Sequence, residues 1–394
     1  MTNTAAASRI HIDPPRQQGA VVHWEGELVT PSGRVHRIYF EFSTPDDLPY
    51  PARARPFLLA FLLPAMNVGA PLELELPVDA VTLDNLMEWQ EAMASWNPQT
   101  LKVVPIRAPL DTQPDVPRER GALTAFSGGV DSNFTAWRHS RNVESPAFRT
   151  AQLRAGLMIH GFDIPLEQED VFERAWNRSR KMLEAFGLTA YRMNTNLLSL
   201  GELPGCDWAS SAHGIWLAAA LSCYEPWFGQ ILIPSTYAYP KLRLPWGSNP
   251  VTDPLFSSAT TTCWHDGAAY TKLTKMQVIA DQPAVQQNLR VCWEGKQLDR
   301  NCGHCFKCVA TQICFQLCGV EKPDAFPDPC TLAQAARVPV TSEQNDWLLR
   351  SMCREARLQG KHQIARALNR ALTRGRIKHS FLKMKKTIRR LTRK

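Results

Sequence analysis

The first third of the chain alternates apolar and polar residues in the manner of β-strands, with one helical stretch. Residues 20–43 predict two strands around a Pro-Ser-Gly turn, and residues 72–79 have the same two-residue period. Apolar residues at helical spacing predict a helix over 82–96. Three prolines within 108–121 indicate a linker. We therefore expect residues 1–115 to form a small N-terminal α+β domain.

After residue 120 the pattern changes to short apolar runs that alternate with amphipathic stretches. The runs predict strands at 122–126, 154–160, 189–194 and 229–235, and the stretches predict helices at 132–140, 167–186 and 209–225. This β-α-β alternation favours a parallel sheet covered by helices on both faces, so residues 120–320 are expected to form an α/β domain. Residues 331–374 look all-helical, which predicts a helical region over 321–376.

Composition is typical of a soluble globular protein. Of 394 residues, 44% are hydrophobic and 21% charged, and no apolar run approaches the ~20 residues of a membrane span. The longest run, 57–66, contains Pro64. No basic stretch followed by an apolar core marks a secretory signal, which predicts a cytoplasmic location. In a reducing compartment, eleven cysteines indicate metal binding or catalysis rather than disulfides.

The net charge of +8 comes from the C-terminal end of the chain. Residues 354–394 hold fifteen Lys and Arg against one acid, so the remainder is mildly acidic. Within 377–394, apolar residues recur every three or four positions, which predicts a basic amphipathic helix: Ile377, Phe381, Met384, Ile388 and Leu391. Such a helix suits an acidic protein, RNA or an anionic membrane surface. A solvated helix or a disordered end is the alternative.

The sequence Ser-Gly-Gly-Val-Asp-Ser at 127–132 lies where the first strand of the α/β domain gives way to its first helix. Paired glycines there let an anion approach the backbone, and a helix start supplies unpaired N–H groups that suit phosphate. The spacing is neither that of a Walker loop nor the dinucleotide G-x-G-x-x-G. We therefore expect this loop to bind a phosphate group. Its residues are Ser127, Gly128, Gly129, Val130, Asp131 and Ser132.

Four cysteines are spaced C-x9-C-x2-C-x2-C, at Cys292, Cys302, Cys305 and Cys308. Overlapping C-x2-C turns plus a fourth thiolate can complete a tetrahedral zinc site, and Gly303 eases the turn. A closed four-sulfur site is structural, because no position is left for a catalytic water. An iron–sulfur cluster and a set of simply buried thiols are the alternatives.

The loop at 127–132 resembles the S-G-G-x-D-S loop of the PP-loop ATP pyrophosphatases, a superfamily with the adenine nucleotide alpha hydrolase-like fold. The resemblance implies that the loop holds the pyrophosphate end of ATP, that Mg²⁺ assists, and that AMP is transferred to the substrate. Together with the cysteines, the loop resembles 7-cyano-7-deazaguanine synthase over residues 120–320. The segment 274–280 is similar to that family's Thr-Lys-x-Glu-Ile-Ile, which implies that Lys275 contacts phosphate or adenylate, although Gln277 replaces the usual Glu.

The chain departs from that synthase in two ways. About 120 residues precede the loop, and the family's Arg-Asn pair is replaced by a stretch containing Ser211, His213 and Gly214. A deazapurine substrate is therefore not implied. The chain resembles more closely a broader set of bacterial PP-loop proteins that carry an N-terminal extension.

Further polar residues follow the predicted strands of the α/β domain. Asp163, after the second strand, is a candidate for Mg²⁺ or ribose, and its neighbour His160 for substrate. Ser235, Tyr237 and Asp253 lie in a long polar loop and are candidate substrate contacts. A plain turn and a surface loop are the alternatives. The pair His265-Asp266 is more typical of a structural role than of a catalytic one.

The leading functional hypothesis is an ATP-dependent adenylating ligase, with Asp131, Ser132 and Lys275 as its catalytic residues. A carboxylate or amide oxygen of an unidentified substrate would attack the α-phosphorus of ATP, and a nitrogen nucleophile would then displace AMP. The alternatives are a PP-loop sulfurtransferase that thiolates a tRNA base or a small molecule, and a nucleotide-binding partner subunit without turnover.

Overall fold

The computed structural model of the protein describes residues 6–141 and 150–391, with side chains left out at 119–120, 141 and 377–391. Packing divides the chain into two compact units. The first comprises residues 1–127 and 131–269, and the second comprises 128–130 and 270–394. The four segments predicted from the sequence, 1–115, 120–320, 321–376 and 377–394, stay a prediction.

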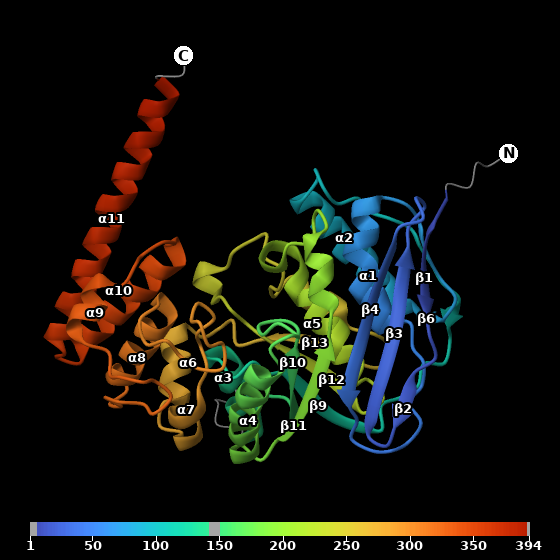
Figure 1. Ribbon diagram of the computed structural model, residues 1–394, viewed down its shortest axis with the longest axis horizontal. Coiled ribbons are helices and arrows are strands. Elements are labelled where there is room, and N and C mark those ends of the chain that lie inside the picture. Colours follow the sequence, from blue (N-terminus) through green and yellow to red (C-terminus); the bar gives the residue numbers. More distant parts are fainter. Residues whose placement is uncertain (1–5, 142–149, 392–394) are drawn as a thin grey trace. The chain divides into compact units, whose positions relative to one another are not determined.

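One mixed sheet runs through the first unit (Figure 1). Its strand order is β13-β12-β9-β10-β11-β4-β3-β1-β5-β7, with β2 paired to β3. The strands are β1 (Ser8–Ile12), β2 (Arg16–Gln18), β3 (Val21–Val29), β4 (Val35–Ser43), β5 (Leu72–Leu74), β7 (Ile106–Arg107), β9 (Glu119–Ala125), β10 (Leu153–His160), β11 (Thr189–Thr195), β12 (Phe228–Pro234) and β13 (Thr262–Asp266). The short strands β6 (Val78–Asp79) and β8 (Leu110–Asp111) pair separately.

The parallel half of the sheet is formed by the five strands that come last in the sequence, β9 to β13. The chain enters at β9, moves through β10 to β11, and then returns to the other side of β9 for β12 and β13, so the strand order is 3-2-1-4-5. All pairings within this half are parallel. The α/β class with a mostly parallel central sheet, predicted from the alternating pattern, is confirmed.

The N-terminal strands extend this parallel sheet directly. β4 pairs antiparallel with β11, with Phe42 opposite Met193, and β3 and β1 continue the sheet outward. The core is continuous as well, since Phe40 and Trp24 share one buried cluster with Ile231. Antiparallel N-terminal strands and parallel strands therefore fold around one common core.

Helix α1 (Arg55–Val68) lies at the centre of this core. Residues 55–66 of the helix are all buried, including Pro64. The other helices of the first unit are α2 (Ala80–Trp96), α3 (Val130–Arg141), α4 (Glu169–Ala185) and α5 (His213–Ser222). A helix buried on every side needs apolar residues all round, which explains why the segment has no helical period.

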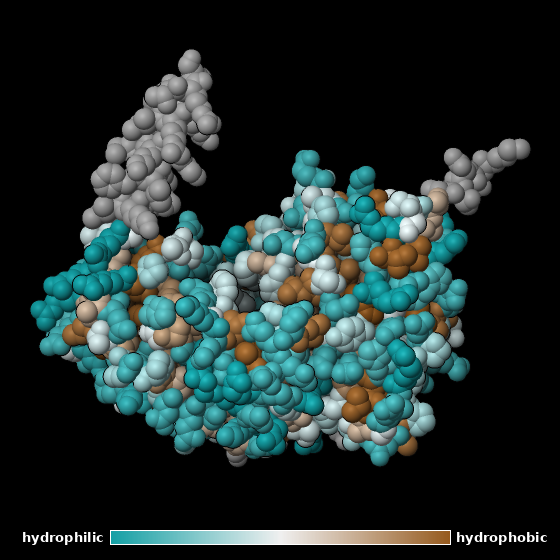
Figure 2. Space-filling model, viewed as in Figure 1, coloured by the Kyte–Doolittle hydropathy of each residue, from teal (hydrophilic) through white to brown (hydrophobic). Residues whose placement is uncertain are grey.

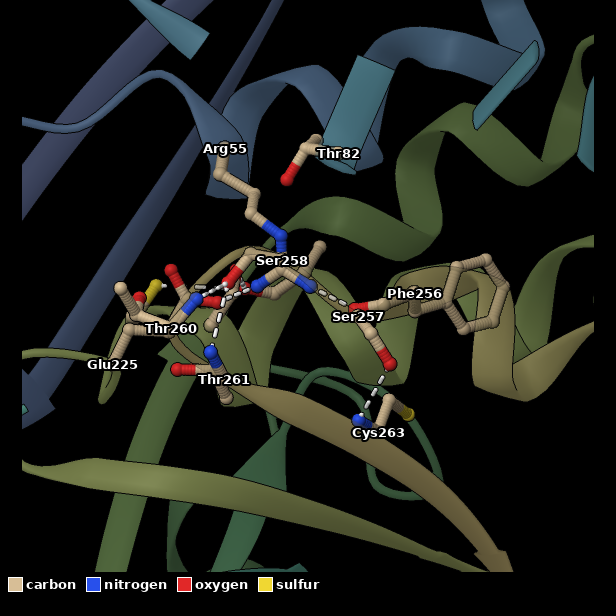
Figure 3. Close-up of polar contacts among 12 residues, drawn as sticks. Arg55, Thr82, Glu225, Phe256, Ser257, Ser258, Thr260, Thr261 and Cys263 are labelled. Carbon is tan, nitrogen blue, oxygen red and sulfur yellow. Dashed lines mark hydrogen bonds and ion pairs between the residues drawn. The ribbon is translucent and has the colours of Figure 1, made fainter. Parts of the chain in front are cut away.

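A buried ion pair ties α1 to the rest of the unit (Figure 3). The Arg55 guanidinium pairs with the Glu225 carboxylate, just beyond α5, and donates to the carbonyl of Phe256. Only 6% and 4% of these two side chains are exposed. Burial lowers the pKa of Arg55 to about 10, so the guanidinium stays charged at neutral pH. The contact joins three elements that are far apart in sequence.

The second unit consists mainly of helices, which are connected by the cysteine-bearing loop, by a further loop at 318–331 and by shorter turns. Its helices are α6 (Lys272–Ile279), α7 (Pro283–Asn288), α8 (Phe306–Leu317), α9 (Leu332–Arg337), α10 (Glu343–Leu358) and α11 (His362–Leu391). The helical character predicted for 331–374 is confirmed. The predicted apolar face of the tail falls on side chains outside the described residues, where only the backbone of α11 is described.

On the face shown in Figure 2, hydrophobic residues of the first unit form separate small patches among hydrophilic ones. Among the described residues, no helix combines the length and the apolar character that crossing a bilayer requires.

Candidate functional site

The Ser-Gly-Gly loop connects the central parallel strand to the first helix of the parallel half. β9 ends at Ala125 and α3 begins at Val130, so residues 126–129 form the connection. Gly128 has a φ of +76°, a conformation that residues with a side chain rarely adopt. Asp131 lies in the first turn of α3, and the neighbouring Ser132 is 4% exposed. The strand–loop–helix context expected for a phosphate loop is present.

The position of this strand within the sheet is informative. β9 lies between β10 and β12, and the chain leaves it on opposite sides, toward β10 first and β12 later. In open parallel sheets, ligands bind outside the carboxyl ends of the strands at such a reversal of strand order. The loop therefore follows a strand at the place where this class of fold binds its ligands.

Within the second unit, a short segment links the loop glycine to the cysteines. The backbone N–H of Arg290 donates to the Gly128 carbonyl at 2.9 Å. The next two N–H groups, of Val291 and Cys292, donate to the side-chain oxygen of Asn301 at 2.9 and 3.2 Å. The Asn301 amide group in turn donates to the carbonyls of Leu289 and Ala325 at 2.8 and 2.9 Å.

The four predicted cysteines converge in the second unit. The Sγ atoms of Cys292, Cys302, Cys305 and Cys308 all lie within 4.8 Å of one another. The Cys292–Cys305 and Cys302–Cys308 separations are both 3.8 Å. Four sulfurs at about 2.3 Å from a zinc ion form a tetrahedron with edges of roughly 3.8 Å. The donor set and its spacing therefore suit a metal ion such as zinc.

Hydrogen bonds within this cluster favour the thiolate form of Cys305. Gly303 has a φ of +79°, which allows the tight turn between the cysteines. Cys305 caps the N-terminus of α8, and its Sγ accepts the N–H of Cys308. The hydrogen bond from the Cys308 thiol, together with this backbone contact, lowers the pKa of Cys305 to about 5 against the opposing effect of burial. A thiolate is the form that ligates metal.

The remaining seven cysteines lie apart from the cluster. Burial raises the pKa of the Cys206 and Cys314 thiols to about 12, and that of Cys318 and Cys330 to about 11. These four are protonated at neutral pH and have little nucleophilic character.

The residues predicted after the second strand belong to the turn between β10 and α4. His160 is 3% exposed, stacks on Phe172 with ring centroids 4.2 Å apart, and contacts the Pro165 carbonyl through Nε2 at 2.9 Å. Asp163, three residues later, is exposed. The roles assigned to both residues stay predictions.

The long polar loop after β12 packs by aromatic contacts. Tyr237 meets Trp246 edge to face at 5.0 Å, and Trp246 lies against His213 at 5.6 Å. Burial lowers the pKa of His213, which favours the neutral imidazole. Ser235 is fully buried, and its backbone N–H donates to the Asp266 carbonyl at 2.7 Å.

Asp253 is fully buried and paired with a histidine. Its Oδ2 lies 2.7 Å from Nδ1 of His265 and accepts the Ser248 hydroxyl at 2.6 Å. Its Oδ1 accepts the N–H of Asn249 at 3.1 Å. Direct substrate contact by Asp253 stays a prediction, whereas its pairing with His265 is a feature of the fold.

Asp266, which follows His265 on β13, has its side chain on the opposite face of the sheet from that of His265. It accepts from Thr135 at 2.7 Å and from Arg138, and lies 3.0 Å from Nε2 of His139, all on α3. Burial alone would raise the pKa of Asp266, but His139, Arg138 and Thr135 together hold it well below its usual range. The two residues of the His-Asp pair thus serve separate clusters.

The predicted site residues fall into two groups. Ser127, Asp131, Ser132, His160, Asp163, Ser235, Tyr237 and Asp253 belong to the first unit, and Gly128, Gly129, Val130, Lys275 and the four cysteines belong to the second. Lys275 lies in α6 and is 2% exposed. Its contact with a nucleotide stays a prediction.

Two elements of the site were not predicted from the sequence. Asn301 directly precedes Cys302, and its position beside a ligand was the only available signal. His265 was noted, but its partner Asp253 is twelve residues earlier, with a loop and a strand start between them. No spacing rule connects these two.

Comparisons with known proteins identify no relative of this chain. No family model, no curated protein and no solved structure matches the chain. Function therefore has to be argued from the loop, the sheet and the cysteine cluster.

Proposed function

We propose that the protein is an ATP-dependent adenylating ligase of the PP-loop type. In this reaction a carboxylate or amide oxygen of the substrate attacks the α-phosphorus of ATP, and pyrophosphate leaves. A nitrogen nucleophile then attacks the activated carbon and displaces AMP. The substrate itself is not identified by the residues described.

One observation carries the proposal. The sequence Ser-Gly-Gly-Val-Asp-Ser forms the connection between the central parallel strand and α3, in a sheet of strand order 3-2-1-4-5. Chain reversal beside that strand is where such sheets bind ligands, and a helix start preceded by glycine suits phosphate oxygens. The sequence motif and the topology support the same location independently.

The residues of the loop have distinct roles in this proposal. Backbone N–H groups and the hydroxyls of Ser127 and Ser132 would hold the pyrophosphate end of ATP. Asp131 and Asp163 carry the carboxylates suited to Mg²⁺. Lys275 would offset negative charge that develops on the phosphates. Positioning and electrostatics suffice for phosphoryl chemistry of this kind, so no protein nucleophile is needed.

The cysteine cluster has a structural role in the same proposal. Four sulfurs around one ion leave no open position for substrate. The cluster would fix the segment that holds Gly128 through the Arg290 N–H.

Thiolation is the competing reaction, and the cysteines disfavour it. A sulfur carrier in this chain would need a reactive thiolate outside the metal cluster. Burial holds the pKa of four of the other cysteines at about 11 to 12. Iron in the anaerobically purified protein, or salt-sensitive tRNA binding, would reverse this preference.

The test uses ATP labelled at the α-phosphate, with Mg²⁺ and the small-molecule fraction of a cell extract. We expect labelled AMP and pyrophosphate. Release of ADP and phosphate would contradict the proposal, and no turnover with any fraction would favour a non-catalytic nucleotide-binding subunit.

A variant at the loop locates the nucleotide. Ser132→Ala should weaken ATP binding by about tenfold or more, as expected for loss of a hydrogen bond to a charged group. Ser140→Ala is the matched control, because Ser140 is on the same helix and its hydroxyl bonds to the Trp137 carbonyl. Full ATP affinity in Ser132→Ala would exclude the assigned site.

A further inference from the structure

A buried carboxylate and imidazole form a pair at the end of β13. The side chains of Asp253 and His265 are 0% and 3% exposed, and Oδ2 lies 2.7 Å from Nδ1. A carboxylate accepts hydrogen bonds and cannot donate them, so the proton between the two atoms is on His265 Nδ1. The Ser248 hydroxyl and the Asn249 N–H hold the carboxylate in place. The orientation and tautomer of the ring are thereby fixed.

The other ring nitrogen of His265, Nε2, can accept or donate one further hydrogen bond. His265 Nε2 is buried and has no hydrogen-bond partner among the described residues. A buried polar atom without a partner destabilises a fold by about 1–3 kcal/mol. Trp246 Nε1, on the loop that supplies Ser248, is a second such atom. Because His265 Nε2 is buried without a partner among the described residues, we interpret it as the atom that a bound reactant contacts.

The pair lies at the edge of the sheet where the proposed nucleotide loop begins. Thr124 of β9, Leu232 of β12 and Trp264 of β13 form one row across the three strands. His265 is one residue beyond this row, toward the carboxyl ends. Because neighbouring strands are about 4.8 Å apart, His265 lies roughly 10 Å from β9 across the sheet. His265 and the residues that follow β9 therefore lie at the carboxyl ends of the same set of parallel strands.

The side chain also faces away from the helix that follows the loop. Asp266 contacts α3, whereas Cys263 packs in the core with α1 and α5. Side chains alternate along a strand, so His265 lies on the Cys263 face. Gly214 at the start of α5 confirms the neighbourhood, since a Cβ placed there would lie 3.1 Å from Asp253 Oδ1.

We propose that His265 is the general base for the nitrogen nucleophile and that Asp253 is its positioning residue. This inference rests on the proposed ligase function. Ammonia or an amine attacks the carbonyl carbon of the acyl adenylate, the C–N bond forms, and the bond from that carbon to the AMP oxygen breaks. One proton of the attacking nitrogen passes to His265 Nε2, and AMP leaves with its oxygen. No oxidant or further reactant is required.

The experiment separates the two half-reactions. The first is followed as exchange of labelled pyrophosphate into ATP in the presence of the extract fraction that supports AMP formation. The second is followed as AMP release with ammonium chloride, and separately with hydroxylamine, which is uncharged and strongly nucleophilic at neutral pH and needs little help from a base.

His265→Gln should lose at least 100-fold in ammonia-dependent AMP release, the lower end of the usual contribution of a general base. Exchange and hydroxamate formation should stay within about threefold of wild type. Ammonia-dependent release within threefold of wild type would overturn the inference. An equal loss of exchange would overturn it too, because His265 would then act before the nucleophile enters.

Asp253→Asn tests the positioning role by a readout other than rate. The wild-type proton NMR spectrum should contain a strongly deshielded imidazole N–H resonance that is absent from both His265→Gln and Asp253→Asn. Asp253→Glu should restore it in part. Persistence of that resonance in Asp253→Asn would contradict the pairing.

Two controls keep the outcomes distinct. His11→Gln replaces an exposed histidine on β1 and should leave every rate unchanged. If the wild-type protein itself shows no exchange with any fraction, the proposed ligase function has failed and the base assignment fails with it. If wild type exchanges and His265→Gln still uses ammonia, only the base assignment has failed.

Discussion

At the scale of single residues, Asp266 shows how one carboxylate secures a strand end. It is 5% exposed and bonds to Thr135, Arg138 and His139 on α3. We expect Asp266→Asn to lower the free energy of unfolding at pH 7 by about 3–5 kcal/mol, because the buried Arg138 guanidinium would lose the Asp266 carboxylate that it contacts. Urea denaturation monitored by tryptophan fluorescence measures the difference.

The same residue predicts a pH dependence. Because the pKa of Asp266 is lower in the folded chain than in the unfolded one, its stabilising contribution is complete above the unfolded value of about 4. It is lost as the pH falls below that value. The stability difference between wild type and Asp266→Asn should therefore shrink below pH ~4. Asp47→Asn, at an exposed position, should change stability little at any pH. A difference that stays constant down to pH 2 would contradict the assignment.

At the scale of secondary-structure elements, sequence periodicity predicted those whose two faces differ. The strands β3 and β4, the helix α2 and all four strand positions between 122 and 235 were predicted at the right places. The helix α1 was not predicted, because its apolar residues surround the whole helix and leave no period. β13 was missed for another reason: its five residues Thr-Cys-Trp-His-Asp include two polar side chains that pair inside the fold.

In the candidate site too, features set by local sequence were predicted and features that depend on distant segments were not. Local spacing predicted the cysteine cluster correctly, since three of its cysteines lie within seven residues. The loop at 127–132 was placed correctly between a strand and a helix for a similar reason. The Asp253–His265 pair and the bonds of Asn301 depend on how distant segments meet, which no local pattern records.

The Arg55–Glu225 pair gives a prediction at the element scale. Arg55→Met should lower the free energy of unfolding by about 3–5 kcal/mol, because Glu225 would be buried without a counter-charge. The double variant Arg55→Met, Glu225→Leu should recover a large part of that loss, since both charges are then replaced by apolar groups. Chemical denaturation measures all three proteins.

The control for this series is an exposed ion pair between two strands of the same unit. Arg9 is 64% exposed and pairs with Glu73 at 3.2 Å, so Arg9→Met should cost no more than about 1 kcal/mol. Equal losses of unfolding free energy in Arg9→Met and Arg55→Met would mean that the buried Arg55 contacts stabilise the fold no more than an exposed ion pair does.

At the scale of the whole molecule, the cysteine cluster and the sheet belong to separate compact units. We expect the purified protein to contain about one zinc per chain, and Cys308→Ser to contain almost none. Hydrogen exchange should then accelerate at Arg290, Val291 and Cys292, whose N–H groups are bonded in the cluster-bearing segment. Exchange in β9 and β12 should stay slow, because their ladder lies within the first unit.

A cysteine outside the cluster provides the comparison for this variant. Cys318 is partly exposed and follows α8, so Cys318→Ser should keep its zinc and its exchange pattern. Loss of zinc from both variants, or faster exchange spread evenly over both units, would contradict a local structural role for the ion.

Zinc removal should also weaken nucleotide binding, even though a closed four-sulfur site touches no substrate. The connection is short and contains one hydrogen bond. Cys292 is two residues after Arg290, whose N–H holds the Gly128 carbonyl, and Gly128 belongs to the proposed phosphate loop. Losing one such anchor corresponds to about 1.4 kcal/mol, so ATP should bind roughly tenfold more weakly to the metal-free protein. Calorimetric titration before and after chelation, with zinc re-addition restoring the affinity, measures this coupling. Unchanged affinity in zinc-free protein would mean that the loop keeps its shape without the cluster, and that the metal serves the helical unit alone.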